Sequence, residues 1–182
     1  MNLIYVVDKD DNVIGEVDDN RPDAIDGLIC RVSGCWVINP TNKEVLIAQR
    51  SLKKWHSPGE WSPSVVGTVE VGETYEQNIR KEVAEEIGLV NVEFLPIGKW
   101  LHSGGHDYFY QMFLTECDWP VERFTLQDEE VAQVKWVNID ELAKDLNANP
   151  NKYVSSFSES LLCLKNALET ELSLVTNERR QE

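Results

Sequence analysis

Basic residues are scarce in this 182-residue chain, which has 17 Lys and Arg against 32 Asp and Glu and a net charge of −15 at pH 7. Because Lys and Arg supply the contacts to phosphates and anionic headgroups, this deficit argues against nucleic-acid and membrane-surface partners. The sequence also lacks an apolar run near the roughly 20 residues that a membrane-spanning helix needs. Small anionic substrates are still possible if basic residues cluster locally and a metal is present.

Cysteine is also sparse, and the four cysteines form no CxxC pair. We expect buried free thiols, with a catalytic thiol as the minority alternative. The stretch MNLIYVVDKDDN turns acidic after seven residues, which is not expected of a signal peptide. These features together predict a cytoplasmic protein with reduced thiols. The cysteines are Cys30, Cys35, Cys117 and Cys163.

The length and a hydrophobic fraction of 42% predict one sizeable core and a single domain over residues 1–182. The first two predicted strands are joined by the turn-forming DKDDN and form a β-hairpin within residues 1–20. The stretch SLKKWHSPGEW is expected to be a loop, because Pro58 and Gly59 interrupt it. Strands are predicted at residues 3–7, 13–17, 28–39, 44–49, 64–70, 92–101, 107–116 and 133–137.

Two helices are expected after the last predicted strand. Asn138 is a suitable N-cap for a short helix that ends near Leu146. A C-terminal helix is predicted over residues 151–175, because apolar residues recur there at three- and four-residue steps. We expect this apolar face to pack on the sheet, with a dimer face as the alternative. The face consists of Val154, Phe157, Leu161, Leu164, Leu168, Leu172 and Val175.

A further helix, between Thr74 and Gly88, is the most informative segment. Thr74 and Gln77 fit a capping box, in which a hydroxyl and an amide satisfy backbone N–H groups at the helix start. Gly88 suits the left-handed residue that ends a helix. A stripe that recurs every four residues should face the core, and it consists of Tyr75, Ile79, Val83 and Ile87.

Glu82, Glu85 and Glu86 crowd one side of this helix, because residues at i, i+3 and i+4 are neighbours. At roughly 100° per residue, Glu86 falls inside the apolar sector, while Glu82 and Glu85 run off its edge. Like charges this close repel each other, and a carboxylate at a buried edge is costly to desolvate. A hard divalent cation such as Mg²⁺ would stabilise them. The alternative is a solvated acidic helix face.

The spacing around the helix resembles the Nudix box, a pattern of glycines, glutamates and one arginine. Lys81 stands where the family usually has arginine. It keeps the positive charge but loses the planar, two-pronged donor that would brace Glu73. The matching places are Gly67, Glu73, Lys81, Glu82, Val83, Glu85, Glu86, Gly88 and Leu89.

The resemblance implies a Nudix-type α/β/α sandwich with a mixed β-sheet. It also implies a pyrophosphohydrolase that cleaves the diphosphate linkage of a nucleoside diphosphate joined to another group, or of a related organic diphosphate. Mg²⁺ or Mn²⁺ would be held by Glu82, Glu85 and Glu86, and the carbonyl of Gly67 would complete the ligand set. One helix glutamate, or an acid from a loop, would take the proton from the attacking water.

Other charged residues are candidates for the same site. Glu130, ahead of Trp136, resembles an acid that the family has before its last strand. A metal or base role and a solvated turn are equally open for it. Arg50 and Lys54 belong to a local basic cluster and would bind phosphate oxygens. The alternative for this cluster is a solvated loop.

Several ring-bearing side chains lack a pattern that assigns them to chemistry. Their spacing does not match that of metal ligands, so a surface or core position is expected for His56, His102 and His106. Packing in the core is expected, rather than stacking on a base, for Trp55, Trp61 and Trp100.

The stretches VLIAQRSLKKWHSPGEWSPSVVG and QDEEVAQVKW resemble the branch of the family that includes isopentenyl-diphosphate isomerases. The isomerase cysteine, histidine and distant glutamate fall on Val66, Thr68 and, approximately, Tyr108, which cannot replace them chemically. A hydrolase is therefore favoured, with an isomerase-like enzyme and a non-catalytic Nudix-fold nucleotide-binding module as alternatives. The substrate stays open, and a homodimer is expected only because such assemblies are common.

Overall fold

The computed structural model describes residues 3–18 and 27–178, with side chains described as far as residue 170. Within these ranges, nine strands form one sheet. The strands are β1 (Leu3–Val7), β2 (Val13–Asp18), β3 (Ile29–Asn39), β4 (Glu44–Arg50), β5 (Trp61–Pro63), β6 (Val65–Thr68), β7 (Leu95–His102), β8 (Asp107–Glu116) and β9 (Val131–Asn138).

The sheet is mixed, and the long strand β3 lies at its centre. β3 pairs in parallel with β8, from Ile29 opposite Asp107 to Ile38 opposite Glu116. It pairs antiparallel with β4 and β6, while β9 continues the sheet beyond β4 and β7 continues it beyond β8. This pairing brings β6, which precedes helix α1 (Tyr75–Ile87), next to the middle of β3.

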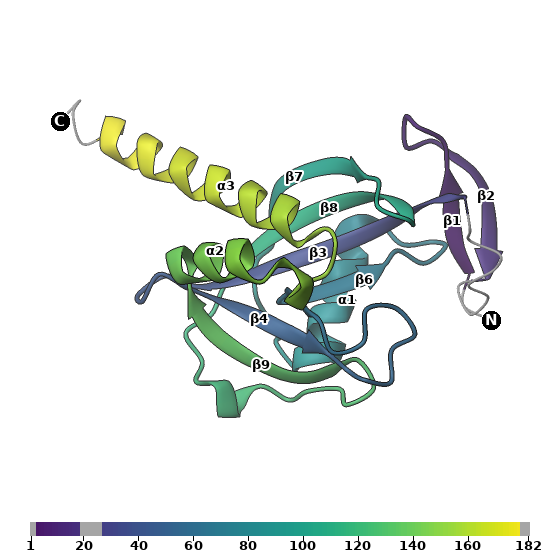
Figure 1. The fold of residues 1–182 in the computed structure, drawn as a ribbon. Helices are drawn as coiled ribbons and strands as arrows, with labels where there is room; N and C mark the ends of the chain where they lie inside the picture. Colours follow the sequence, from purple (N-terminus) through teal and green to yellow (C-terminus); the bar gives the residue numbers. More distant parts are fainter. Residues whose placement is uncertain (1–2, 19–26, 179–182) are drawn as a thin grey trace.

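Helices cover the sheet on both faces (Figure 1). Helix α1 lies on one face, and α2 (Ile139–Ala148) and α3 (Phe157–Glu178) lie on the other. Alternation along β3 fills both layers: Cys35 and Val37 belong to the core under α1, whereas Trp36 and Ile38 belong to the core under α2 and α3. The predicted mixed-sheet α/β/α sandwich is confirmed, because one sheet separates two hydrophobic cores.

The N-terminal hairpin of β1 and β2 is clamped to the rest of the sheet by Asp11, in its turn. Arg31 Nε donates to Asp11 Oδ1 at 2.7 Å, and Lys99 pairs with Asp11 Oδ2. The Tyr75 hydroxyl donates to the same carboxylate at 3.1 Å. One largely buried acid therefore joins the hairpin turn to β3, β7 and the start of α1.

The C-terminal helix begins at Phe157 rather than at residue 151. Pro150 opens a single 3-10 turn, after which Tyr153 pairs with Trp61 and the Val154 N–H donates to the Trp61 carbonyl at 3.0 Å. Val154 therefore precedes the helix. Phe157, Leu161 and Leu164 form the buried face of α3. The predicted face residues Leu172 and Val175 lie outside the described side chains.

The predicted loop SLKKWHSPGEW is wrong at its last residue, because Trp61 begins strand β5 and pairs with Gln49 of β4. Strand β7 also begins later than predicted, at Leu95 instead of residue 92. The N-cap role of Asn138 is confirmed, since its side chain accepts from the backbone of Asp140. In the described part of the chain, no helix is long and apolar enough to cross a membrane.

Candidate active site

Helix α1 carries three of the predicted metal ligands, and local sequence fixes both of its ends. Thr74 and Gln77 form the predicted capping box, and Gly88 ends the helix with φ 70°, in the left-handed region. The core-facing stripe is confirmed for Ile79, Val83 and Ile87, which are buried, whereas Tyr75 is only partly buried.

The glutamates of α1 leave the apolar stripe in the predicted angular order. Glu86 is buried, Glu82 is half-buried and Glu85 is exposed. A helix face that passes gradually from core to solvent therefore places three carboxylates along one edge.

Glu82 lies directly against the backbone of β6. A Cβ atom added at Gly67 would be 2.3 Å from Glu82 Cγ and 2.8 Å from its Oε1. Glycine at residue 67 is therefore needed for the close approach of helix and strand. Any larger residue would push the Glu82 carboxylate out of its present position.

Lys81 contacts two acids that precede helix α1. Its Nζ lies 2.9 Å from Glu70 Oε1 and 3.1 Å from Glu73 Oε1. The Glu82 carboxylate is farther, at 3.8 Å. Glu73 also accepts a hydrogen bond from Asn78 Nδ2 at 2.9 Å. Lysine thus reaches Glu73 as a point charge, without the paired geometry of a guanidinium.

The surroundings of two α1 glutamates, Glu82 and Glu86, disfavour the charged form of their carboxyl groups. Burial raises the pKa of Glu82 to about 7, and Lys81 opposes the added effect of Glu85 and Glu130. Burial, together with the charges of Glu82 and Glu130, raises the pKa of Glu86 well above its usual range. Carboxyls perturbed in this way, beside one cavity, mark a candidate functional site.

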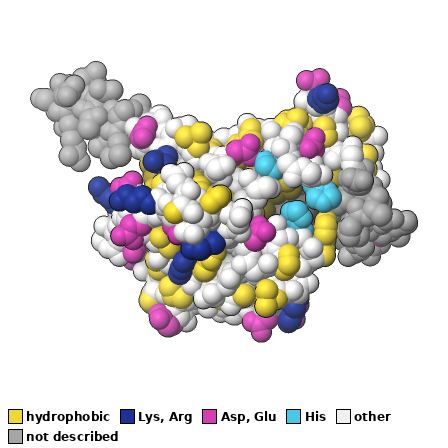
Figure 2. Space-filling view, in the orientation of Figure 1, with side chains coloured by type: hydrophobic (Ala, Val, Ile, Leu, Met, Phe, Trp, Pro, Cys, Tyr) yellow, Lys and Arg dark blue, Asp and Glu magenta, His cyan; other side chains and the backbone are white. Residues whose placement is uncertain are grey.

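These side chains line a cavity of about 370 Å³ between α1, β6, β3 and the loops after β4 and β7. Figure 2 shows a hollow on this side of the molecule with histidine side chains around it. The acids in the lining are Glu70, Glu82, Glu85, Glu86, Asp107 and Glu130; the bases are Arg50, Lys54 and Lys81.

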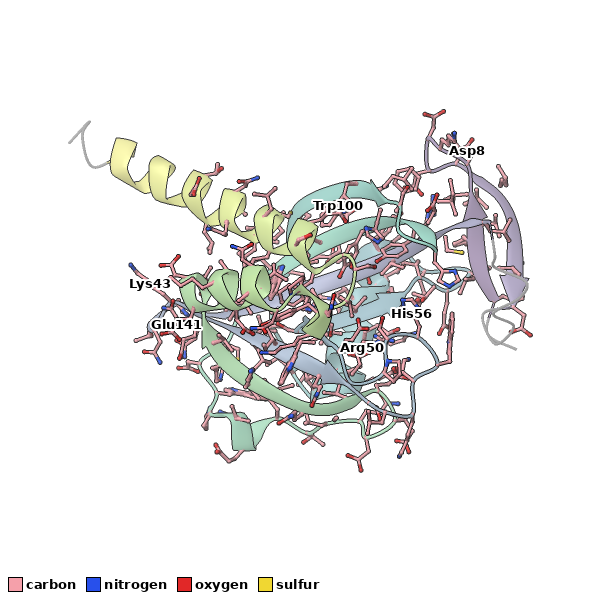
Figure 3. All side chains as sticks on the ribbon, viewed as in Figure 1. Asp8, Lys43, Arg50, His56, Trp100 and Glu141 are labelled. Atoms are coloured by element: carbon pink, nitrogen blue, oxygen red, sulfur yellow. The ribbon has the colours of Figure 1, made fainter. Side chains whose placement is uncertain are left out.

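The predicted phosphate-binding residues lie at this cavity, Arg50 as the last residue of β4 and Lys54 on the loop that follows. Lys54 forms an ion pair with Glu130, which comes from the loop before β9. The Arg50 Nε donates to the backbone carbonyl of His56 at 3.1 Å, and both residues are labelled in Figure 3. Lysine, arginine and the loop acid therefore meet at one cavity with the helix glutamates.

An aromatic rim at the cavity was missed in the sequence. The rings of His56 and His106 are 5.5 Å apart, and Trp55 lies within 5.8 Å of both. Trp55 is 55% exposed, so the expectation that it packs in the core is wrong. His56 and His106 line the cavity, whereas His102 is buried. The two loops that carry these residues are far apart in sequence, and neither has a periodic pattern that would have predicted the contact.

The three places that an isomerase would use also line the cavity: Val66, Thr68 and Tyr108. A thiol is present nearby, because Cys30 of β3 pairs in register with Tyr108 of β8 and lines the same cavity. The four cysteines form no disulfide, and Cys30, Cys35 and Cys117 are buried, as expected. Cys163 is only partly buried.

The donors fit a hard divalent cation, because they are carboxylate oxygens with surplus negative charge. Among the described residues, however, no three His, Cys, Asp or Glu side chains form a ready-made ligand set. Glu82 is turned toward Asn78 Nδ2, at 3.2 Å, and Glu130 toward Lys54. A bound ion would therefore exchange places with these partners.

Comparison with known proteins assigns the chain to a family. The sequence model of the NUDIX domain matches residues 29–157, which is more than half of the chain, so the protein belongs to the Nudix family. The crystal structure of a Deinococcus radiodurans protein has a TM-score of 0.76 at 21% identity, over 87% of this chain and 96% of that one. That likeness shows that the fold is shared.

The chain is similar to two named members of the family. A prenyl-diphosphate phosphatase from Methanosarcina mazei is 30% identical over 163 residues, which cover 88% of this chain and 93% of that protein. An isopentenyl-diphosphate Delta-isomerase from Aliivibrio fischeri is 28% identical over 118 residues, which cover 61% of this chain and 65% of that protein. The chain is an enzyme of the pyrophosphohydrolase class, acting on a small-molecule diphosphate.

Proposed function

We propose that the protein uses Mg²⁺ or Mn²⁺ to hydrolyse the diphosphate linkage of an organic diphosphate. The supporting observation is the group of α1 carboxylates at one cavity, two of which have strongly raised pKa values. Glu82, Glu85 and Glu86, with the Gly67 carbonyl, are the proposed ligands. When bound, the ion screens the charge of the diphosphate and activates water.

The protein's own residues would complete the reaction. Arg50 and Lys54 would bind the phosphate oxygens. To bind a phosphate, Lys54 would break its ion pair with Glu130. Released from its ion pair, Glu130 is the proposed acceptor of the proton from the attacking water. Lys81 and Glu73 would position Glu82, since Lys81 contacts both acids.

An apolar organic group is favoured over a nucleoside. One part of the cavity wall is apolar and comes from the hairpin, β3 and the residue before it, β6 and the segment before α3. This part of the wall can bury an apolar chain, whereas its side chains offer no hydrogen bonds to a sugar or base edge. The two relatives described above are named as a prenyl-diphosphate phosphatase and an isopentenyl-diphosphate Delta-isomerase. The apolar residues are Ile4, Leu28, Val32, Val66 and Val154.

The test is a screen for Mg²⁺-dependent phosphate release over prenyl diphosphates, sugar nucleotides and dinucleotides. We expect Glu85→Gln to lower the rate by about 10²-fold or more. The matched control is Glu76→Gln, an exposed glutamate that pairs with Arg80 on the same helix and should leave the rate unchanged. Hydrolysis that survives EDTA, or a Glu85→Gln variant as fast as wild type, would contradict the proposal.

An isomerase-like reaction is the second candidate, because Cys30 supplies a thiol at the cavity that Val66 cannot. It would incorporate deuterium from solvent into isopentenyl diphosphate without phosphate release. Replacement of Cys30 by Ala should abolish that exchange and leave hydrolysis intact.

We also propose that residues 1–182 act as one domain, in the cytoplasm, with its four cysteines as thiols. A homodimer is the proposed assembly and is tested by the molar mass in solution.

A further inference from the structure

A serine, a histidine and a glutamate meet where α3 begins beside the end of β7. His102 is the last residue of β7, Ser155 precedes α3, and Glu159 lies in its first turn. The His102 Nδ1 is 2.5 Å from Glu159 Oε2, and the His102 Nε2 is 3.2 Å from Ser155 Oγ. None of the three belongs to the proposed metal and diphosphate machinery.

The two ring contacts would allow the imidazole to take a proton from the serine. With Nδ1–H donated to the Glu159 carboxylate, neutral His102 leaves Nε2 free to accept from the Ser155 hydroxyl. The Trp100 indole N–H (Trp100 is labelled in Figure 3) donates to the same Glu159 oxygen at 3.3 Å. The imidazole is buried and packs against Tyr108, with ring centroids 4.9 Å apart and the ring planes tilted by 40°. A base held by a carboxylate and aimed at a hydroxyl is the arrangement that activates a serine nucleophile.

The serine is accessible, although the histidine is not. Ser155 is exposed and lines both the diphosphate cavity and a neighbouring groove that Gly104 and Ser158 also line. A Cβ atom at Gly104 would be 2.7 Å from His102 Nε2 and 3.6 Å from Ser155 Oγ. The absence of a side chain at residue 104 therefore leaves the serine–histidine contact open from this side.

We propose that Ser155 is the nucleophile of a second, metal-independent site that hydrolyses small carboxylic esters. The Ser155 Oγ attacks the ester carbonyl while its proton passes to His102 Nε2, and Glu159 stabilises the resulting imidazolium. The carbon–oxygen bond to the alcohol breaks, and the alcohol leaves with the proton from His102. Water then attacks the acyl-serine with His102 as base, which releases the carboxylic acid and restores the hydroxyl.

The test measures hydrolysis of p-nitrophenyl acetate by the full chain in EDTA, so that the outcome is independent of the diphosphate reaction. We expect Ser155→Ala to abolish the activity above the background of other surface groups, and Glu159→Gln to lower it by about 10²-fold. The matched control is Ser158→Ala, because Ser158 is exposed in the same groove. It should retain the wild-type rate.

A second measurement tests the site without replacing the buried histidine. A fluorophosphonate probe should add its mass to the peptide that contains Ser155, and Glu159→Gln, which changes a partly exposed side chain, should slow that labelling. Equal esterase rates for wild type and Ser155→Ala, or a label on any other serine with none on Ser155, would overturn the proposal. Loss of Mg²⁺-dependent phosphate release in Glu85→Gln with an unchanged ester rate separates the two sites.

Discussion

Replacing Glu82 by Gln should stabilise the metal-free protein at alkaline pH and remove its main response to Mg²⁺. Burial raises the pKa of Glu82 to about 7, from a usual value of 4.5. The folded state therefore binds a proton that the unfolded state releases between these two values. Stability that is present below the unfolded pKa is lost as the pH rises through the folded pKa.

The size of the effect follows from the shift. The full difference corresponds to about 3 kcal/mol, and about 2 kcal/mol of it should be lost between about pH 5.5 and about pH 8. For a chain of this length, that is a fall in melting temperature of roughly 4–8 °C. Saturating Mg²⁺ at the higher pH should reverse the fall, since a cation compensates the ionised carboxylate.

Thermal unfolding of wild type and Glu82→Gln, with EDTA or with Mg²⁺, checks this reasoning. The difference between the two proteins in EDTA should grow with pH in favour of the variant, and Mg²⁺ should stabilise only the wild type. Glu76→Gln, on the exposed side of α1, serves as the control and should follow the wild type. Parallel pH profiles for wild type and Glu82→Gln would show that Glu82 is not strained by its charge.

Two further substitutions test features of the fold. Gly67→Ala should lower the free energy of unfolding by about 1–3 kcal/mol, because the new methyl group would overlap Glu82. Urea denaturation measures this change. The control is Gly15→Ala, which should cost less because its Cβ has only ordinary contacts. Asp11→Asn should cost about 1–3 kcal/mol, because it weakens charge-assisted hydrogen bonds from three side chains. The exposed Asp10→Asn is its control, and equal urea midpoints for the two variants would refute the clamp.

Features that depend on neighbours in sequence could be predicted. The capping box of Thr74 and Gln77, the left-handed Gly88 and the order in which Glu86, Glu82 and Glu85 leave the core all follow from the period of an α-helix. The cover of helices on both faces of the sheet was instead implied by the resemblance to the Nudix family, because no local pattern predicts it.

Contacts between distant segments could not be predicted. Lys54 and Glu130 are 76 residues apart, and each alone reads as a solvated charge. His102 and Ser155 are 53 residues apart, and the sequence offers no spacing rule that would join them. Such meetings are decided by the parallel pairing of β3 with β8 and by loop paths, which leave no local pattern. The start of α3 was missed for a similar reason, since Tyr153 is held by a strand from the middle of the chain.

The N-terminal hairpin shows how shape and charge are linked in this enzyme. β1 pairs with β3 at one position, Val7 opposite Ile29, and a second bridge joins Ile4 to Glu70. The hairpin turn is held mainly through Asp11, yet Ile4 on the same hairpin forms part of the apolar wall of the cavity. If the proposed apolar substrate group lies against this wall, an acid that takes no part in cleavage helps to set the room for it, and we expect changes in that turn to alter substrate choice before they alter the chemistry.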